Sequence, residues 1–166
     1  MNLKFVSVAL LIFSFVFIVS AVTLTKDATE KVIVTKAYRV SVEDSSDLGS
    51  DKTLVFGYAD IYAKDYPDQV AARLAIFVYD GIIYRATGAG FSYDQTSGGI
   101  SREEGAGSIV NSDGTEQNDA FSYFISFDTN SDIDEMEFRF SGDSGRVLKM
   151  KEVLKAVEEP IVWRPE

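Results

Sequence analysis

The 166-residue sequence contains no cysteine and no histidine. Without cysteine the protein has no disulfide bonds, no thiolate nucleophile and no iron–sulfur ligands. Without histidine it has no Ser-His-Asp triad and none of the usual ligand sets for zinc, copper or non-haem iron. A dinucleotide-binding glycine motif is missing too, because Gly88 and Gly90 have no third glycine after them. Any enzymatic chemistry would therefore rest on carboxylates, tyrosines or lysines.

Positive charge is also scarce in this sequence. The chain has 16 Lys and Arg residues against 26 Asp and Glu residues, which gives a formal net charge of −10 at pH 7. An acidic surface repels the phosphates of nucleic acids and the headgroups of anionic lipids. We therefore expect no nucleic acid partner.

The N-terminus carries one long apolar run. Lys4 precedes the apolar stretch Phe5–Val19, and Val19-Ser20-Ala21 ends on the small residue that signal peptidase sites require. We predict a cleavable signal peptide over residues 1–21, and hence a secreted or cell-surface protein. The alternative is an uncleaved anchor, because the 18 residues from Phe5 to Val22 are at the lower limit of what spans a bilayer. Contact with a membrane is expected only in that case.

The remaining residues, 22–166, are expected to form a single, mainly β domain. Apolar and polar residues alternate with a period of two over most of this length, as they do in half-buried strands. In the first predicted strand, residues 31–42, the even-numbered positions from Val32 to Val42 are mostly apolar and are expected on one face. Leu54–Tyr62 is apolar on both faces and reads as a central strand.

The clearest hairpin signal is Asp80-Gly81, because a type I′ turn needs two residues that tolerate positive φ. A two-residue loop at this point pairs Phe77 with Tyr84 and, further along, Ala75 with Ala86. A second hairpin is predicted from residues 121–127 and 136–141, which alternate aromatic or aliphatic residues with polar ones.

Two segments break the period-two pattern. Residues 93–119 are rich in Gly, Ser and Asp, so we expect a long irregular segment with a short strand at 106–111. Apolar residues recur at helical spacing over residues 147–157, before Pro160, which predicts an amphipathic helix. The predicted fold class is thus mainly β: an antiparallel β-barrel or β-sandwich with one C-terminal amphipathic helix.

One acidic segment has the spacing of a cation site. Oxygen ligands at alternate positions of a loop can converge on a hard cation such as calcium. However, Ile133 stands where such loops need glycine for a sharp turn. The alternative is a solvated acidic hairpin tip without a cofactor. The candidate metal ligands are Asp128, Asn130, Asp132 and Asp134.

Two further sets of residues are candidate sites. The adjacent acids Glu103 and Glu104 are the candidate catalytic pair, because glycoside hydrolysis needs two carboxyl groups. Tyrosines can line a groove and stack on a sugar or an apolar ligand, although they also serve as core residues. The candidate ligand-binding residues are Tyr58, Tyr62, Tyr79, Tyr84 and Tyr93.

Three functions remain open on these observations. The first, which we expect, is an exported non-enzymatic β domain that acts as a surface or extracellular structural or protein-interaction module. Its partner would be another protein or a second copy of itself, joined by strand addition along residues 31–42. The second is a β-barrel that binds a small ligand or a carbohydrate. The third is a carboxylate-dependent hydrolase.

Overall fold

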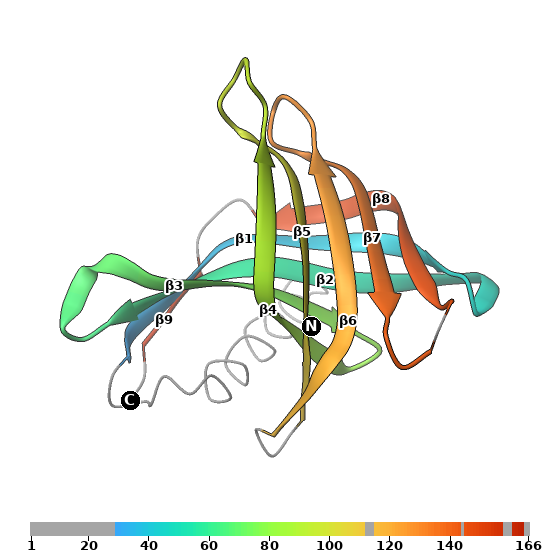
Figure 1. Ribbon diagram of the computed structural model, residues 1–166, viewed down its shortest axis with the longest axis horizontal. Helices are drawn as coiled ribbons and strands as arrows, with labels where there is room; N and C mark the ends of the chain where they lie inside the picture. The colour runs from blue at the N-terminus through green and yellow to red at the C-terminus, as the bar shows by residue number, and fades with distance from the viewer. Residues whose placement is uncertain (1–28, 112–114, 144, 158–160, 165–166) are drawn as a thin grey trace, which may run out of the picture.

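The computed structural model describes residues 29–111, 115–143, 145–157 and 161–164, and these ranges contain nine strands (Figure 1). The predicted signal peptide, residues 1–21, lies outside the described residues. The strands are β1 (Thr29–Asp44), β2 (Asp47–Ala63), β3 (Tyr66–Tyr79), β4 (Ile82–Tyr93), β5 (Ile100–Val110), β6 (Glu116–Phe127), β7 (Ile133–Phe140), β8 (Val147–Val157) and β9 (Ile161–Trp163).

The strands form one antiparallel sheet that closes into an eight-stranded barrel. Their order around the barrel is β2-β3-β4-β5-β6-β7-β8-β1, and β1 pairs with β2 to complete the ring. β9 is an extra strand that pairs with β1 beyond the point where β8 ends. Of the two predicted architectures, the barrel is therefore confirmed.

The barrel is built from two groups of strands that cross each other, β4–β7 and β1–β3 with β8 (Figure 1). They are joined on one side by β3 and β4, which pair only from Tyr79↔Ile82 to Ile76↔Arg85. The predicted pairing of Phe77 with Tyr84 is confirmed. The predicted pairing of Ala75 with Ala86 is wrong, because β3 continues along β2 while β4 continues along β5.

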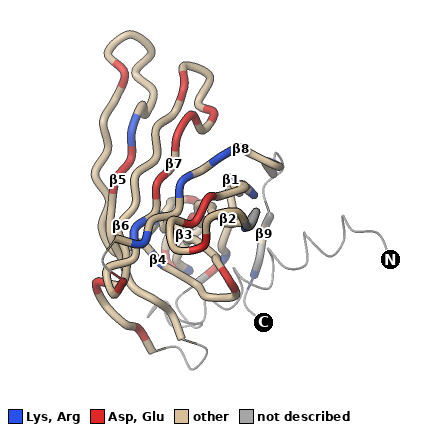
Figure 2. Tube along the Cα trace, turned by 90° about the vertical axis from the view of Figure 1, so that its right-hand side faces the viewer, with Lys and Arg blue, Asp and Glu red and all other residues tan. Residues whose placement is uncertain are grey.

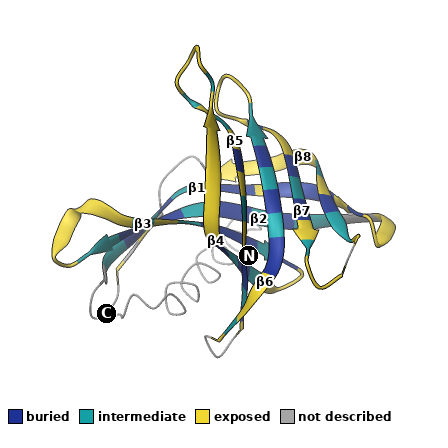
Figure 3. Ribbon diagram, in the orientation of Figure 1, coloured by how far each residue is buried: buried dark blue, intermediate teal, exposed yellow. Residues whose placement is uncertain are grey.

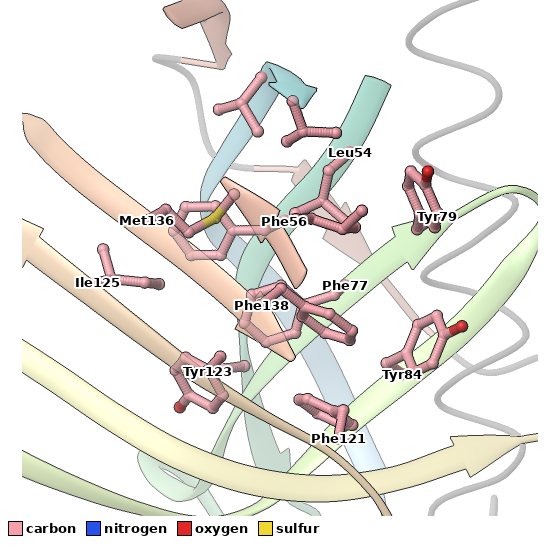
Figure 4. Packing of buried hydrophobic residues seen from close by; sticks show 14 of the residues in the cluster. Leu54, Phe56, Phe77, Tyr79, Tyr84, Phe121, Tyr123, Ile125, Met136 and Phe138 are labelled. Carbon is pink, nitrogen blue, oxygen red and sulfur yellow. The ribbon is translucent and has the colours of Figure 1, made fainter. Parts of the chain in front are cut away.

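Aromatic side chains fill the closed part of the barrel (Figure 4). The Phe77 ring lies 4.8 to 5.7 Å, between centroids, from the rings of Phe56, Phe121, Tyr123 and Phe138. Phe77 is fully buried, and burying such a side chain stabilises a fold by about 1.5–3 kcal/mol. By contrast, β4 is exposed along most of its length beyond Ala86 (Figure 3). The packed core therefore ends where β3 and β4 separate.

A second apolar cluster lies on the opposite face of β1–β3. It includes Val32, Val34, Ile61 and Ile76, none of which belongs to the barrel core. A register shift between Val34 and Lys36 gives β1 one extra residue relative to β2. Such a bulge moves the residues before it to the other face of the sheet. The prediction that Val32 and Val34 share a face with Tyr38 is therefore wrong.

The predicted C-terminal helix is also wrong, because residues 147–157 form strand β8. β8 pairs with β1 with two register shifts, and each shift gives β8 one extra residue. As a result Leu148, Met150, Val153 and Ala156 lie opposite buried residues of β1 at spacings of two and three instead of a constant two. The helix prediction relied on Val147, Met150, Leu154 and Val157, but Met150 lies opposite Val42 of the barrel core and Val157 lies opposite Ala37 of the second cluster, so these residues do not form one apolar face.

The predicted irregular segment at residues 93–119 is mostly strand. β5 extends over Ile100–Val110, which is longer than the short strand expected at 106–111, and β6 begins at Glu116. Glycine misled the prediction here, because Gly105 and Gly107 lie inside β5 where neighbouring backbone approaches closely. The predicted hairpin of residues 121–127 and 136–141 is confirmed by the pairing of β6 with β7.

Candidate functional site

A cavity of about 700 Å³ opens where β3 and β4 separate. Its walls come from β4, β5 and β6 on one side and from β1, β2 and β3 on the other. It therefore lies between the two crossing groups of strands. The lining residues that matter for its chemistry are Tyr58, Arg73, Phe91, Tyr93, Glu103 and Tyr123.

Glu103 forms the buried end of this cavity. It lies on β5 opposite the fully buried Ile125 of β6, so its side chain faces into the barrel, and it is only 2% exposed. The Tyr123 hydroxyl donates a hydrogen bond of 2.5 Å to Oε1, and the Tyr58 hydroxyl donates another to Oε2. Each carboxyl oxygen thus accepts one tyrosine hydroxyl, and a carboxylate has no proton of its own to donate.

The two tyrosines are held in their protonated form. Burial, reinforced by the charge of Glu103, raises the pKa of the Tyr58 and Tyr123 hydroxyls well above the ordinary tyrosine value of about 10. Loss of either proton would place a second negative charge beside the buried carboxylate. At neutral pH both hydroxyls therefore remain hydrogen-bond donors to Glu103.

Gly105 lets Tyr123 reach Glu103. Tyr123 on β6 lies opposite Gly105 on β5, two residues from Glu103. A Cβ atom at Gly105 would lie 2.7 Å from Cε1 of Tyr123 and 2.3 Å from the carbonyl oxygen of Gly88 on β4. Only glycine leaves room for this ring and for this backbone approach. The residue thus supports the site without a side chain of its own.

The β4–β5 side of the cavity mouth is apolar. Phe91 lies opposite Glu103 across β4 and β5, and Tyr93 lies opposite Ile100. Directly opposed residues share a face of the sheet, so these side chains lie on the inner face of the β4–β5 hairpin. All three large side chains, those of Phe91, Tyr93 and Ile100, are exposed. Apolar side chains left exposed beside a cavity are typical of a binding surface.

Two basic side chains, Arg73 and Lys36, also line the cavity, and neither lies within ion-pair distance of Glu103. Arg73 donates from Nε and Nη2 to the two carboxylate oxygens of Asp60, at 2.6 and 2.8 Å. Asp60 is buried at 2% exposure, whereas the Arg73 side chain is 56% exposed. Lys36 on β1 is an exposed residue of the lining and lies opposite Tyr58 on β2. Arg73 is thus already neutralised by a fixed partner.

The five predicted ligand-binding tyrosines divide between the cavity and the rest of the barrel. Tyr58 and Tyr93 line the cavity. Tyr84 is buried in the aromatic core against Phe121 and Phe138, and Tyr79 donates its hydroxyl proton to Asp44. Tyr62 lies outside the lining, with the ammonium of Lys31 4.7 Å from its ring centroid. Two of the five are therefore placed to contact a ligand.

The two candidate catalytic acids do not face each other. Adjacent strand residues point to opposite faces, so Glu103 lies in the cavity while Glu104 is exposed on the outer surface. Glu104 accepts a hydrogen bond of 2.9 Å from Arg102. Within the described part of the chain, Glu103 is the one acidic residue of the cavity lining.

The predicted calcium ligands lie at the tip between β6 and β7. Oδ1 of Asp128 accepts hydrogen bonds from the backbone N–H groups of Asn130 and Asp132, at 2.8 and 2.9 Å. These bonds lower the pKa of Asp128 and close the turn. Asp134, the fourth predicted ligand, is exposed on β7. Among the described residues, no three acidic side chains gather as metal ligands would, so the structure does not support the calcium prediction.

Sequence reasoning missed Tyr123 and Arg73 as site residues. The signal for Tyr123 was present, since it is the one hydroxyl on the apolar face of residues 121–127, and a buried tyrosine hydroxyl needs a partner. Arg73 had no such signal, because its position in the lining depends on where β3 leaves β4.

Comparison of the chain with protein-family models, with curated proteins and with solved structures finds no match. The site must therefore be interpreted from its own geometry. Within the described residues, no helix has both the length and the apolar character needed to cross a membrane.

Proposed function

We propose that the protein is an exported, non-enzymatic β-barrel that binds a small, largely apolar molecule in the cavity that ends at Glu103. The observation that carries this proposal is a cavity of about 700 Å³ with apolar side chains on the β4–β5 side of its mouth and one buried polar cluster at its end. Ligand pockets in proteins commonly have volumes of about 300–1,000 Å³ and combine apolar walls with a few convergent polar groups.

The barrel geometry supports the same proposal. An eight-stranded barrel is just wide enough to be filled by side chains or to hold one small ligand. Here the aromatic core fills one part of the barrel, and the separation of β3 from β4 leaves the other part open. The export part of the proposal rests on the predicted signal peptide, which lies outside the described residues.

A fluorescence titration tests the proposal. N-phenylnaphthylamine is an uncharged apolar compound whose emission rises when it leaves water, and we expect saturable binding to the full chain. Ala89 faces the cavity, so Ala89→Trp should fill the cavity and weaken binding by about tenfold or more. Gln95→Trp, at the exposed tip of the same hairpin, is the matched control and should bind as the natural protein does.

Two outcomes of the titration would contradict the proposal. One is the absence of saturable binding to the natural protein. The other is equal loss, or equal retention, of binding in the Ala89→Trp and Gln95→Trp variants, which would place the compound outside the cavity. Circular dichroism of each variant separates loss of binding from loss of the fold.

The other two hypotheses have less support from the geometry. Strand addition along residues 31–42 needs a free backbone edge, but β1 pairs with β2 on one side and with β8 and β9 on the other. A glycoside hydrolase needs two facing carboxyl groups, whereas Glu103 and Glu104 lie on opposite faces.

A further inference from the structure

The buried end of the cavity offers hydrogen-bond acceptors only. The hydroxyls of Tyr58 and Tyr123 both donate their protons to Glu103, so only the lone pairs on their oxygens remain for a ligand. An ionised carboxylate has about four acceptor sites, and the two tyrosines occupy two of them. A ligand group that complements this cluster must therefore donate hydrogen bonds.

The same end of the cavity carries a negative charge without a basic partner. Among the described residues, no Lys or Arg lies within ion-pair distance of Glu103. Arg73 of the lining is bound to Asp60, and Lys36 is exposed. The attraction between a carboxylate and a positively charged ligand is stronger when the carboxylate is buried than when it is exposed, because water screens the buried charge less.

The walls and the surface of the molecule also suit a positively charged ligand. The rings of Tyr58, Phe91, Tyr93 and Tyr123 line the cavity, and the faces of such rings attract organic cations. Asp and Glu also outnumber Lys and Arg in the chain, by 26 to 16, and Figure 2 marks the described ones along the Cα trace. The resulting field favours the approach of cations.

We propose that the ligand is an organic amine: a protonated ammonium group that binds Glu103, carried on an apolar or aromatic body that lies along Phe91 and Phe127. The ammonium group donates up to three hydrogen bonds and accepts none, so it matches the acceptor-only cluster. This inference rests on the proposed function, because it assigns the ligand class of the same cavity.

The test compares three compounds that share one ring system and differ in the polar group. Naphthylethylamine is positively charged, naphthylethanol is neutral, and naphthylacetate is negatively charged. Each displaces N-phenylnaphthylamine from the full-length protein in a competition titration. We expect the amine to bind about tenfold or more tightly than the alcohol, and the acetate to bind most weakly, since hydrogen bonds to charged groups are the stronger ones.

The substitution Glu103→Gln removes the charge and keeps the shape of the side chain. It should reduce the preference for the amine over the alcohol to about twofold or less. Glu104→Gln is the matched control, because it makes the same change on the adjacent residue outside the cavity, and it should keep the full preference.

The outcomes separate the two proposals. If N-phenylnaphthylamine binds but the alcohol or the acetate displaces it as well as the amine does, the cavity binds ligands and the amine inference is wrong. If the preference for the amine survives in Glu103→Gln, the ammonium group binds elsewhere and the inference is wrong again. If N-phenylnaphthylamine does not bind, the proposed function itself fails. The comparison on the natural protein stands even if Glu103→Gln does not fold.

Discussion

The Tyr123 hydroxyl donates a hydrogen bond of 2.5 Å to Oε1 of Glu103, across the ladder that joins β5 to β6. Tyr58, which is 45 residues from Glu103 in the sequence, donates to the other oxygen from β2. The carboxylate thus connects the two groups of strands that form the cavity walls.

Replacing the tyrosines should destabilise the protein. Tyr123→Phe or Tyr58→Phe removes one donor and leaves an oxygen of the buried carboxylate without that hydrogen bond, at an expected cost of about 1–3 kcal/mol in the free energy of unfolding. Urea denaturation measures this cost. In the Glu103→Gln background the cost of each tyrosine substitution should fall, because the charged acceptor is already gone. Purely additive effects would show that the three side chains are not energetically coupled.

Gly105→Ala should disturb the same site without touching a polar group. The new methyl group would lie 2.3 Å from the Gly88 carbonyl oxygen and 2.7 Å from the Tyr123 ring, so one of them has to move. We expect a loss of about 1–3 kcal/mol in the free energy of unfolding, the usual cost of overpacking. Gly90→Ala is the matched control, since the nearest atom to its new methyl group would be 3.9 Å away. Equal stability of the two variants would be inconsistent with the packing described.

Asp44 should make the protein sensitive to acid. This fully buried carboxylate accepts hydrogen bonds from Arg146, Ser46 and Tyr79, and the bonds from Arg146 are the largest cause of its strongly lowered pKa. Because the pKa of Asp44 is lower in the folded state than in the unfolded state, its ionisation stabilises the fold at pH values above the ordinary aspartate pKa of about 4. This stabilisation is lost as the pH falls below that value.

The substitution Asp44→Asn tests this pH dependence. It should lower the free energy of unfolding by about 1–3 kcal/mol at neutral pH, and the difference from the natural protein should shrink as the pH falls below about 4. Asp94 and Asp128 also have lowered pKa values, so the variant keeps part of the acid sensitivity. Asp143→Asn, at an exposed position, is the control. A difference that stays constant with pH would argue against the role of Asp44.

Asp60 should keep the cavity from accepting anions. It holds the Arg73 guanidinium through two hydrogen bonds, so Asp60→Asn should release this positive charge to the cavity. Naphthylacetate is then expected to bind several-fold more tightly than it does to the natural protein, since a freed guanidinium binds carboxylates well. Displacement of N-phenylnaphthylamine measures the change, with Asp68→Asn, at an exposed position of the neighbouring strand β3, as the control. Unchanged binding of the acetate would mean that Arg73 does not face the ligand.

Local signals in the sequence predicted the parts of the fold that depend on neighbouring residues. The Asp80-Gly81 turn and the alternation in β6 and β7 specify hairpins that the structure confirms. Register shifts carry no comparable signal, because a bulge changes the spacing of apolar residues without changing their number. β8, whose pairing with β1 has two such shifts, was mistaken for a helix.

The site was predictable only in part, for a related reason. Glu103, Tyr58 and Tyr93 were candidates on residue type alone, and the structure brings all three to one cavity. Their grouping depends on the closure of the barrel through β1 and β2, and on the point at which β3 leaves β4. Both are long-range features that no local pattern encodes. The contribution of Gly105 is likewise visible only once Tyr123 lies opposite it.

A crystal structure of the protein with naphthylethylamine would show where the ligand and its amine lie. We expect a single bound molecule in the cavity, with its nitrogen within about 3 Å of a Glu103 carboxylate oxygen and its rings beside Phe91. A molecule bound on the outer surface of the barrel would contradict the proposed binding cavity. A molecule in the cavity with its amine turned away from Glu103 would contradict the assigned ligand class.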